Sequence, residues 1–517
     1  MDKYNLPVCR TLFSDRVEIP KVYEAVLPEY CHNIQRILKS DATASVESTS
    51  CTDGFLRANI RLNVHILYSS EPKGHQKTVC FPFDFEHTFD ASRIGPDSTN
   101  LICEVNTFVV ASNAKQKSPR SMEIKLNICV AANIYDCSEI PLISPEDNPD
   151  VELRTKSCTA AKRIFLSHTP EKHREDITLD AQMPPVADIS DYSCRLVMEN
   201  VNVSEGMLSY NGNAIFKCTY RAEGGSDDAS AEYIYLTKEI PLSGEIASEH
   251  IYSGCIASGR LVLSDVEIDS SFDPYGENRI INVTIGYETV FDVFDEDEIL
   301  YADDGYCTSY ICDLKKNYYT CDSIQGTISD KAEISEKISA ERASVAQVTD
   351  SFIEMNITGT DISEGKLYVS GKASACIMGC DEKGEPCCVQ TSFGIRYPVE
   401  SVKDATPERK YFVNPQIVSD SAVLRDGEIT LSATVQTDGV VLNSSRIEAI
   451  FQADISYDSP KPLCHSEYII YYPESGETLW DIAKKYEISE KEILSANESS
   501  SGGNTARKTV IIPCREI

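Results

Sequence analysis

Four cysteines clustered in the sequence have side chains that could bind a metal ion. Cys376, Cys380, Cys387 and Cys388 carry thiols, which bind zinc as thiolates. Structural zinc sites usually combine two Cys-x2-Cys pairs, whereas these four have gaps of three and six residues followed by an adjacent pair. We therefore expect strand or loop thiols and no metal site. Three more irregularly spaced cysteines are interpreted in the same way: Cys307, Cys312 and Cys321.

Acidic side chains are concentrated in residues 288–304, which hold eight acids and no base. A solvated loop is the default interpretation of such a run, and a docking strip for a basic partner is the alternative. Calcium is not expected, because the ligand spacing of an EF-hand loop is absent. We therefore assign this segment no catalytic or metal-binding role.

The sequence contains none of the motifs of several common enzyme mechanisms. It has no phosphate-binding Gly-x4-Gly-Lys-Ser/Thr loop, no Gly-x-Ser-x-Gly elbow and no His-Glu-x2-His helix. The eight histidines are scattered singly along the chain. We therefore predict a non-enzymatic protein with no catalytic residues and no cofactor.

Charge and composition exclude several classes of partner. Acidic residues outnumber basic ones 81 to 48, so nucleic acid would meet a repulsive field. No apolar run reaches the roughly 18 residues that a membrane span requires. The N-terminal sequence lacks the basic and apolar segments of a signal peptide, which predicts that the chain stays in the cytosol. Most of the 20 cysteines are then expected to be reduced.

Internal repetition predicts how the 517 residues are divided. Segment 186–214 matches segment 345–373 at nine of 29 positions without a gap. A fainter copy lies upstream, where the Asp-Gly pair 53–54 stands for the Glu-Gly pair 205–206. Three copies also agree with the length, since domains average about 150 residues.

Each copy has the pattern of antiparallel β-structure. In the first copy, apolar residues from Leu56 to Ile66 alternate with polar ones, and this period of two is typical of a half-buried strand. A proline follows the first pair of strands in every copy, and proline is tolerated at a sheet edge or a bulge. These prolines are Pro82, Pro241 and Pro398.

The fold class predicted from these patterns is mainly β. It comprises three tandem β-rich, sandwich-like repeats at residues 22–140, 172–313 and 331–458, followed by a small βααβ domain. Residues 141–160 and 322–345 have the composition of linkers or of long crossing segments. Modules on short connectors are expected to form a rod or curved array that presents several surfaces to partners.

The C-terminal segment changes from period two to a compact strand, helix, helix, strand pattern. Residues 468–472 form the first strand, and Thr478 with Asp481 makes a capping box at the start of a helix. Ser489 caps a second helix, and residues 510–513 supply a closing strand. This short segment therefore encodes two capped helices on a two-stranded sheet.

Several side chains of this segment have predicted positions. Tyr468 and Tyr472 are placed on the core side of the strand, with Tyr471 facing out. Trp480 follows the core residue Leu479, so it lies off the most buried face and either covers the edge of the core or contacts a partner. Three lysines give the segment a positive face that could meet an acidic partner, namely Lys484, Lys485 and Lys491.

The order of residues from Tyr468 to Pro513 resembles the LysM domain, and the resemblance covers residues 466–514. It implies a shallow groove for N-acetylglucosamine polymers such as peptidoglycan, between the turn before the first helix and the loop after the second. In that loop the segment 499–504 departs from the usual apolar residue and Pro-Gly turn. The implied groove or partner-binding residues are Gly476, Glu477, Thr478, Leu479, Trp480 and Asn497.

Three copies with a Glu-Gly or Asp-Gly turn, followed by one LysM domain, also resemble the SPOCS-repeat architecture of SipL-like spore coat morphogenetic proteins. That resemblance implies an assembly scaffold in the mother-cell cytoplasm, at the forespore surface. The LysM domain would dock to the SpoIVA-type ATPase of the coat basement layer, and the repeats would recruit other coat proteins. The alternative is a peptidoglycan-binding protein of the spore envelope, and a hydrolase within one repeat is a third hypothesis.

Overall fold

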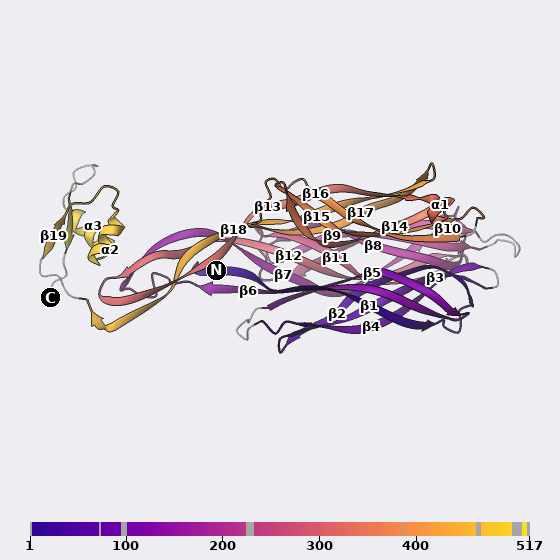
Figure 1. Cartoon of the computed structure of the whole chain (residues 1–517), viewed down its shortest axis with the longest axis horizontal. Helices are drawn as coiled ribbons and strands as arrows, with labels where there is room; N and C mark the ends of the chain where they lie inside the picture. The colour runs from indigo at the N-terminus through magenta and orange to yellow at the C-terminus, as the bar shows by residue number, and fades with distance from the viewer. Residues whose placement is uncertain are drawn as a thin grey trace.

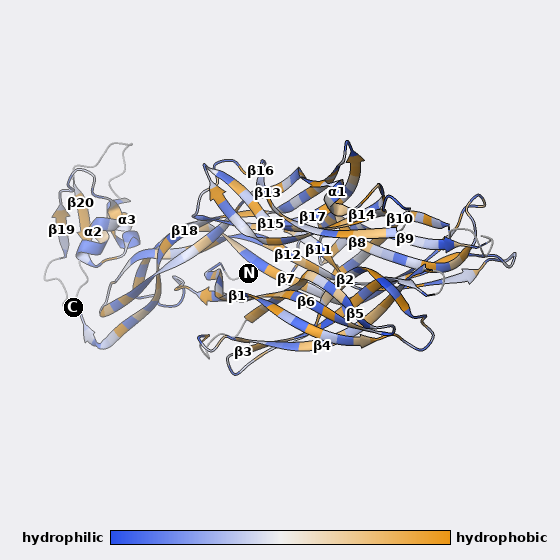
Figure 2. Cartoon of the chain, turned by 45° about the vertical axis from the view of Figure 1, so that its right-hand side comes forward, coloured by the Kyte–Doolittle hydropathy of each residue, from blue (hydrophilic) through white to orange (hydrophobic). Residues whose placement is uncertain are grey.

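The chain is almost entirely β-strand, with two short helices near the C-terminus (Figure 1). A computed structural model describes residues 3–71, 74–94, 101–223, 232–384, 386–461, 467–498 and 509–513. Along the strands, apolar and polar residues alternate over long stretches (Figure 2). The predicted mainly β fold class is therefore confirmed.

The first unit, residues 5–141, consists of two three-stranded antiparallel sheets. One sheet has the strand order β1-β6-β5 and the other has the order β2-β3-β4. Apolar side chains of both sheets form one core, as in a β-sandwich. The strands are β1 (Asn5–Val26), β2 (Ile34–Thr52), β3 (Phe55–Ser70), β4 (His75–Asp90), β5 (Leu101–Ser118) and β6 (Ser121–Pro141).

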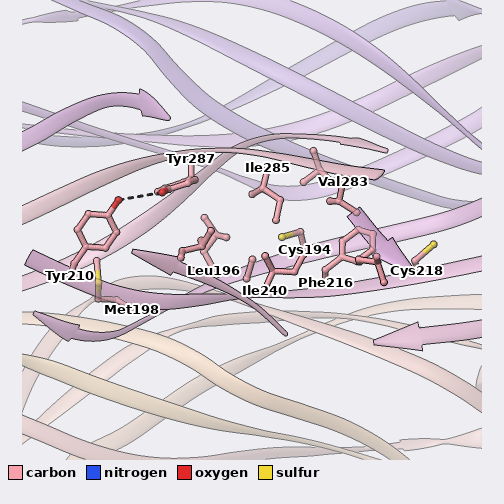
Figure 3. Packing of buried hydrophobic residues seen from close by; sticks show 14 of the residues in the cluster. Cys194, Leu196, Met198, Tyr210, Phe216, Cys218, Ile240, Val283, Ile285 and Tyr287 are labelled. Atoms are coloured by element: carbon pink, nitrogen blue, oxygen red, sulfur yellow. Dashed lines mark hydrogen bonds between the residues drawn. The ribbon is translucent and has the colours of Figure 1, made fainter. Parts of the chain in front are cut away.

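The second unit, residues 151–307, repeats this order as β11-β12-β7 and β10-β9-β8. Its core holds Tyr210, Phe216 and Tyr287, and the hydroxyl groups of the two tyrosines lie 3.2 Å apart (Figure 3). The strands are β7 (Val151–Thr178), β8 (Val186–Ser204), β9 (Met207–Ala222), β10 (Tyr233–Ala247), β11 (Ile256–Phe272) and β12 (Asn278–Cys307).

The third unit, residues 310–460, has the orders β13-β18-β17 and β14-β15-β16. Three tandem sandwich-like repeats are therefore present. Its strands are β13 (Tyr310–Ser339), β14 (Gln347–Ser363), β15 (Lys366–Cys380), β16 (Pro386–Val399), β17 (Arg409–Arg425) and β18 (Glu428–Pro460), with the short helix α1 (Ala340–Ala343) after β13.

The three prolines singled out in the sequence lie on edge strands. Pro82 is in β4, Pro241 in β10 and Pro398 in β16, and each of these strands pairs on one side only within its sheet. Proline lacks the N–H that a second neighbour would need. The predicted edge position is therefore confirmed.

The acid-glycine pairs of the repeat form two-residue hairpin turns. Asp53 and Gly54 connect β2 to β3 with φ angles of 51° and 76°. Glu364 and Gly365 connect β14 to β15 with φ angles of 52° and 73°. In the second copy Gly206 has a φ of 72°. Positive φ at this second turn position is shared by the three copies and explains the recurring glycine.

The matching glycines Gly212 and Gly371 lie where two strands approach closely. A Cβ at Gly212 would collide with the carbonyl oxygen of Val197, and one at Gly371 with that of Asn356. In both units the neighbouring strand bulges close to this carbonyl, so the backbone is pushed toward the glycine. Glycine therefore occurs at this position in both copies because a larger side chain would collide with the neighbouring backbone.

Replacing Gly212 by alanine is expected to lower the free energy of unfolding by about 1–3 kcal/mol, because the new methyl group overpacks the sheet. Urea denaturation followed by circular dichroism measures the effect. Gly394→Ala is the matched control, since this strand glycine has open space around its Cβ position. Equal stability of the two variants would show that the close approach is relieved at no cost.

The first strand of each unit extends beyond what the sequence predicts. Segment 322–345 has the composition of a linker, but residues up to Ser339 belong to β13, and β7 begins at Val151 within segment 141–160. The units therefore begin well before the predicted boundaries 22, 172 and 331. The reason is that β13 exposes most of one face, so it contains too few apolar residues to give a clear strand pattern in the sequence.

The three units pack against each other and do not form a rod. Each unit contacts both of the others, and the first strands β1, β7 and β13 contact one another pairwise. Elsewhere between the three units lies a pocket of 300 Å³, whose lining includes segments 42–44 of β2, 194–196 of β8 and 353–355 of β14. These segments occupy equivalent positions in the three copies of the repeat. The units are therefore arranged around a common pseudo-threefold axis.

The four long strands β7, β12, β13 and β18 of the second and third units extend beyond the sandwich cores as an arm toward the C-terminal domain (Figure 1). Small apolar clusters hold the arm together, one of them formed by Ile143, Ala302 and Ile450. The acidic segment 288–304 lies within β12, so the expected loop is wrong. Buried residues such as Phe291 and Phe294 lie between its acids, and a count of charges does not detect them.

The C-terminal domain has the predicted order of strand, helix, helix and strand. Its small core includes Ile482, Ala483 and Ile493, which come from the two helices. Its elements are β19 (Tyr468–Tyr471), α2 (Leu479–Tyr486), α3 (Glu490–Glu498) and β20 (Val510–Pro513).

The orientation of the tyrosines in this strand differs from the prediction. Tyr468 and Tyr472 are 61% and 69% exposed, whereas Tyr471 packs on Tyr486 with ring centroids 5.4 Å apart. Because side chains alternate along a strand, an error of one residue in phase reverses every assignment. The large aromatic residues at the two ends suggested the wrong phase.

Candidate functional site

The turn before α2 presents a polar surface to solvent. Glu474, Ser475, Gly476 and Thr478 are exposed, and Gly476 has a φ of 92° that favours glycine. Glu477 points back into the turn, where its carboxylate accepts hydrogen bonds from the Tyr471 hydroxyl at 2.9 and 3.0 Å and from the Glu474 N–H at 3.0 Å. Glu477 therefore shapes the turn.

Thr478 fixes the start of α2. Its Oγ1 accepts a hydrogen bond from the Asp481 N–H at 3.3 Å, and the Asp481 carboxylate accepts one from the Thr478 N–H at 2.9 Å. The predicted capping box is therefore confirmed, and it positions the turn relative to the helix. Leu479 is half-buried against the core of the domain.

Asn497 has a structural role. Its side chain is buried, its Nδ2 donates hydrogen bonds to the carbonyl oxygens of Ile493 and Ile511, and its Oδ1 accepts one from the Ile511 N–H. It thereby ties β20 to α3. The loop after α3, at residues 499–508, lies outside the described residues.

Trp480 contacts the arm of its own chain. Its indole N–H donates to a carboxylate oxygen of Asp304 at 3.0 Å, and its ring meets Tyr306 edge-on with centroids 5.1 Å apart. The guanidinium of Arg154 lies 5.9 Å from the ring centre. Trp480 is only 7% exposed. The partner that covers it is β12 of the same chain.

Further polar contacts hold the small domain on the arm. The ammonium of Lys484 lies 2.7 and 2.8 Å from the two carboxylate oxygens of Asp304. The Tyr306 hydroxyl donates to the carbonyl of Ile488 at 2.8 Å, and Lys461 pairs with Glu487 at 2.8 Å. The Lys484 charge is therefore neutralised within the chain and does not contribute to the predicted positive face.

Asp304 is the centre of this contact, which we call the docking contact: Asp304 and Tyr306 on β12 with Trp480 and Lys484 on α2. Burial alone would raise the pKa of Asp304, but the hydrogen bonds from Lys484 and Trp480 outweigh it and lower the pKa to about 2. The carboxylate is therefore charged at neutral pH.

The structure brings four of the six predicted site residues together. Gly476, Glu477, Thr478 and Leu479 are consecutive and form the turn, whereas Trp480 and Asn497 point to other parts of the structure. Asp304 and Tyr306 are contact residues that the sequence did not predict. Their Asp-Gly-Tyr-Cys-Thr motif is visible as a local feature, but nothing in it indicates a partner in the distant C-terminal segment.

Some of the clustered cysteines lie close to another cysteine. Cys376 and Cys388 have sulfur atoms 3.1 Å apart, but across the described part of the chain no group of three or more His, Cys, Asp or Glu side chains could hold a metal ion. Among the cysteines that the structure describes, two pairs form disulfides, Cys9–Cys137 and Cys307–Cys312. The interpretation of Cys307 and Cys312 as free thiols is therefore wrong.

Comparison with known proteins identifies the C-terminal domain. The family model of the LysM domain matches residues 474–504, which include the exposed turn and both helices. No curated protein and no solved structure matches the chain. Within the described ranges, none of the helices has the length and apolar character needed to cross a membrane. The chain therefore consists of three β-sandwich repeats followed by a C-terminal LysM domain.

Proposed function

We propose that this chain is a non-enzymatic scaffold that binds N-acetylglucosamine polymers, such as peptidoglycan, through its LysM domain. One observation carries the proposal. The turn 474–478 is largely exposed, while Trp480 and Lys484 are occupied by the docking contact. The ligand-binding turn of the domain is therefore free while the domain is held on the arm.

The docking contact also gives the scaffold a defined geometry. Trp480 and Tyr306 pack in the same apolar cluster as Ile482 and Ile493, so the LysM core continues into the arm. A flexible tether would allow the domain to reorient freely, whereas this contact restrains it. A ligand bound at the turn is then held in a set orientation relative to the three repeats.

Binding to insoluble peptidoglycan tests the proposal with the full chain. Wild-type protein is expected to sediment with the polymer, and Ser475→Tyr is expected to bind about tenfold more weakly, because a bulky ring at the exposed turn obstructs the ligand. Lys491→Tyr is the matched control, with the same new side chain at an exposed position on α3. Failure of the wild type to sediment, or equal binding by both variants, would contradict the proposal.

A second candidate function is the spore coat scaffold. One observation favours it: Tyr468, Ile470 and Tyr472 are 61%, 65% and 69% exposed at and beside β19. Aromatic and apolar side chains gathered on a surface are typical of protein interfaces. In this proposal the exposed side chains of Tyr468, Ile470 and Tyr472 dock to the SpoIVA-type ATPase at the forespore surface, in the mother-cell cytoplasm. The repeats recruit coat proteins.

A fluorescent fusion imaged in sporulating cells separates the two candidates. The scaffold proposal expects a ring around the forespore that is lost in Ile470→Asp, while peptidoglycan binding by this variant is unchanged. The glycan proposal expects Ser475→Tyr, and not Ile470→Asp, to be impaired in binding to the polymer. A diffuse signal for the wild type would reject the coat scaffold.

A further inference from the structure

Two thiols from different units meet near the base of the arm. Cys158 lies on β7 of the second unit and Cys321 on β13 of the third, and their sulfur atoms are 3.5 Å apart. Cys321 also donates a hydrogen bond to the carbonyl of Thr159 at 3.3 Å. The residues are 163 positions apart in the sequence, so only the packing of the units brings them together.

The surroundings hold the two strands in place. Cys321 and Ala160 belong to an apolar cluster that receives side chains from all three units, including Leu6, Ile299 and Ala449. Cys321 is 1% exposed, whereas Cys158 is half-buried. Cys158 is therefore partly exposed to solvent, whereas Cys321 is enclosed.

We propose that Cys158 and Cys321 are a thiol pair that a small-molecule disulfide, of the glutathione disulfide class, oxidises to a covalent link between the second and third units. The deprotonated Cys158 sulfur attacks one sulfur of the reagent, whose S–S bond breaks as the mixed disulfide forms. The released thiolate takes up the proton that Cys158 lost.

Cys321 then completes the exchange. It loses its proton and attacks the Cys158 sulfur, and the second small thiolate leaves and is protonated. In total, two protein thiols are oxidised to one disulfide, and one small disulfide is reduced to two small thiols. No other oxidant is required.

The electrostatics support this order of attack. The hydrogen bond from Cys321 lowers the pKa of Cys158, which raises the share of the reactive thiolate. The same hydrogen bond, together with burial, raises the pKa of Cys321. Cys158 is therefore the attacking sulfur and Cys321 the resolving one.

Other thiols of the chain provide internal controls. Burial in the core of the second unit raises the pKa of Cys194 and of Cys218 to about 12, so both should remain unreacted under native conditions. Cys376 and Cys388 lie on neighbouring strands of one sheet, so their oxidation would not connect two units.

The consequence of the link is mechanical. It joins the two units whose long strands form the arm that carries the LysM domain. Separation of the units then requires breaking a covalent bond. In the reduced protein, packing, hydrogen bonds and ion pairs oppose it.

The test is peptide mapping of the native full chain after treatment with glutathione disulfide. Remaining thiols are alkylated before unfolding and trypsin digestion. Trypsin releases Cys158 in peptide 157–162 and Cys321 in peptide 317–331, and neither peptide contains another cysteine. The expected product is these two peptides joined, with two hydrogens fewer than their sum, and it should disappear after reduction.

Single variants separate the two steps. Cys321→Ala should accumulate the glutathione mixed disulfide on Cys158, and Cys158→Ala should leave Cys321 unmodified. A joined peptide in the wild type with this pattern supports the proposal. No joined peptide under native conditions, a joined peptide only after unfolding, or a persistent adduct on wild-type Cys158 would overturn it.

Discussion

Replacing Arg195 by methionine should lower the free energy of unfolding by about 3–5 kcal/mol, because it leaves a buried carboxylate without its closest partner. The guanidinium lies 2.7 Å from Asp420, and the side chains are only 10% and 3% exposed. Arg195 also donates to the carbonyl of Ile353 at 2.6 Å and lies over the ring of Phe352. It therefore joins the second unit to the third through several contacts at once.

Urea denaturation of the full chain measures this loss, and two further variants show its origin. The double variant Arg195→Met/Asp420→Leu should recover most of the stability, since an apolar pair can replace a buried ion pair. Arg396→Met is the matched control. Arg396 lies 2.6 Å from Asp361, but both side chains are nearly half exposed, so the loss should stay below about 1 kcal/mol. Equal losses for both single variants would contradict the argument.

The packing of the units could not be predicted from periodicity. Period-two patterns report which face of a strand is buried, and they correctly indicated β3. The prolines Pro82, Pro241 and Pro398 correctly indicated edge strands. They contain nothing about a neighbouring unit. The contact between Lys39 and Asp191, 3.2 Å apart and deeply buried, depends on two charges that look like surface residues in the sequence.

One signal of this packing was nevertheless present. Lys39, Asp191 and Asp350 occupy the same position in the three copies of the repeat. Lys39 pairs with Asp191, while Asp350 pairs with Lys217 of the second unit at 3.0 Å. A change of charge at one position in otherwise similar copies indicates that the copies contact different neighbours. In a rod of equivalent modules, this change of charge between copies would have no structural explanation.

The LysM domain was predictable because its information is local. Capping boxes, helix periodicity and the glycine turn all lie within segment 466–514, and Thr478 and Asp481 bond as expected. The role of Trp480 was not predictable, since its partners Asp304 and Tyr306 belong to a strand of another domain. Docking between domains leaves no periodic pattern in either segment.

Replacing Asp304 by alanine should release the LysM domain from the arm. The variant loses the acceptor of the Trp480 N–H and the partner of Lys484, which together contribute about 2–3 kcal/mol to docking. Trp480 is the only tryptophan of the chain, so its fluorescence reports docking directly. We expect the emission of Asp304→Ala to shift to longer wavelength as the indole becomes exposed to water.

Asp454→Ala is the control for this experiment. Asp454 lies on the arm and pairs with Lys315 at 2.6 Å, so its removal deletes a carboxylate without touching the LysM domain. Its tryptophan emission should equal that of the wild type. Far-UV circular dichroism should be the same for all three proteins, which separates undocking from unfolding. Unchanged emission of Asp304→Ala would show that the other contacts, those of Tyr306 and the Lys461–Glu487 pair, are enough to hold the domain.

The pH dependence of the same signal follows from the depressed pKa of Asp304. A group with a lowered pKa in the folded state stabilises it above its unfolded pKa of about 4, and this contribution is lost as the pH falls toward the folded value. With that value at about 2, docking should persist at pH 4 and weaken between about pH 4 and pH 2. In Asp304→Ala this transition should be absent, because the group that takes up the proton is gone. A wild-type emission that already shifts above pH 5 would assign the docking to a different group.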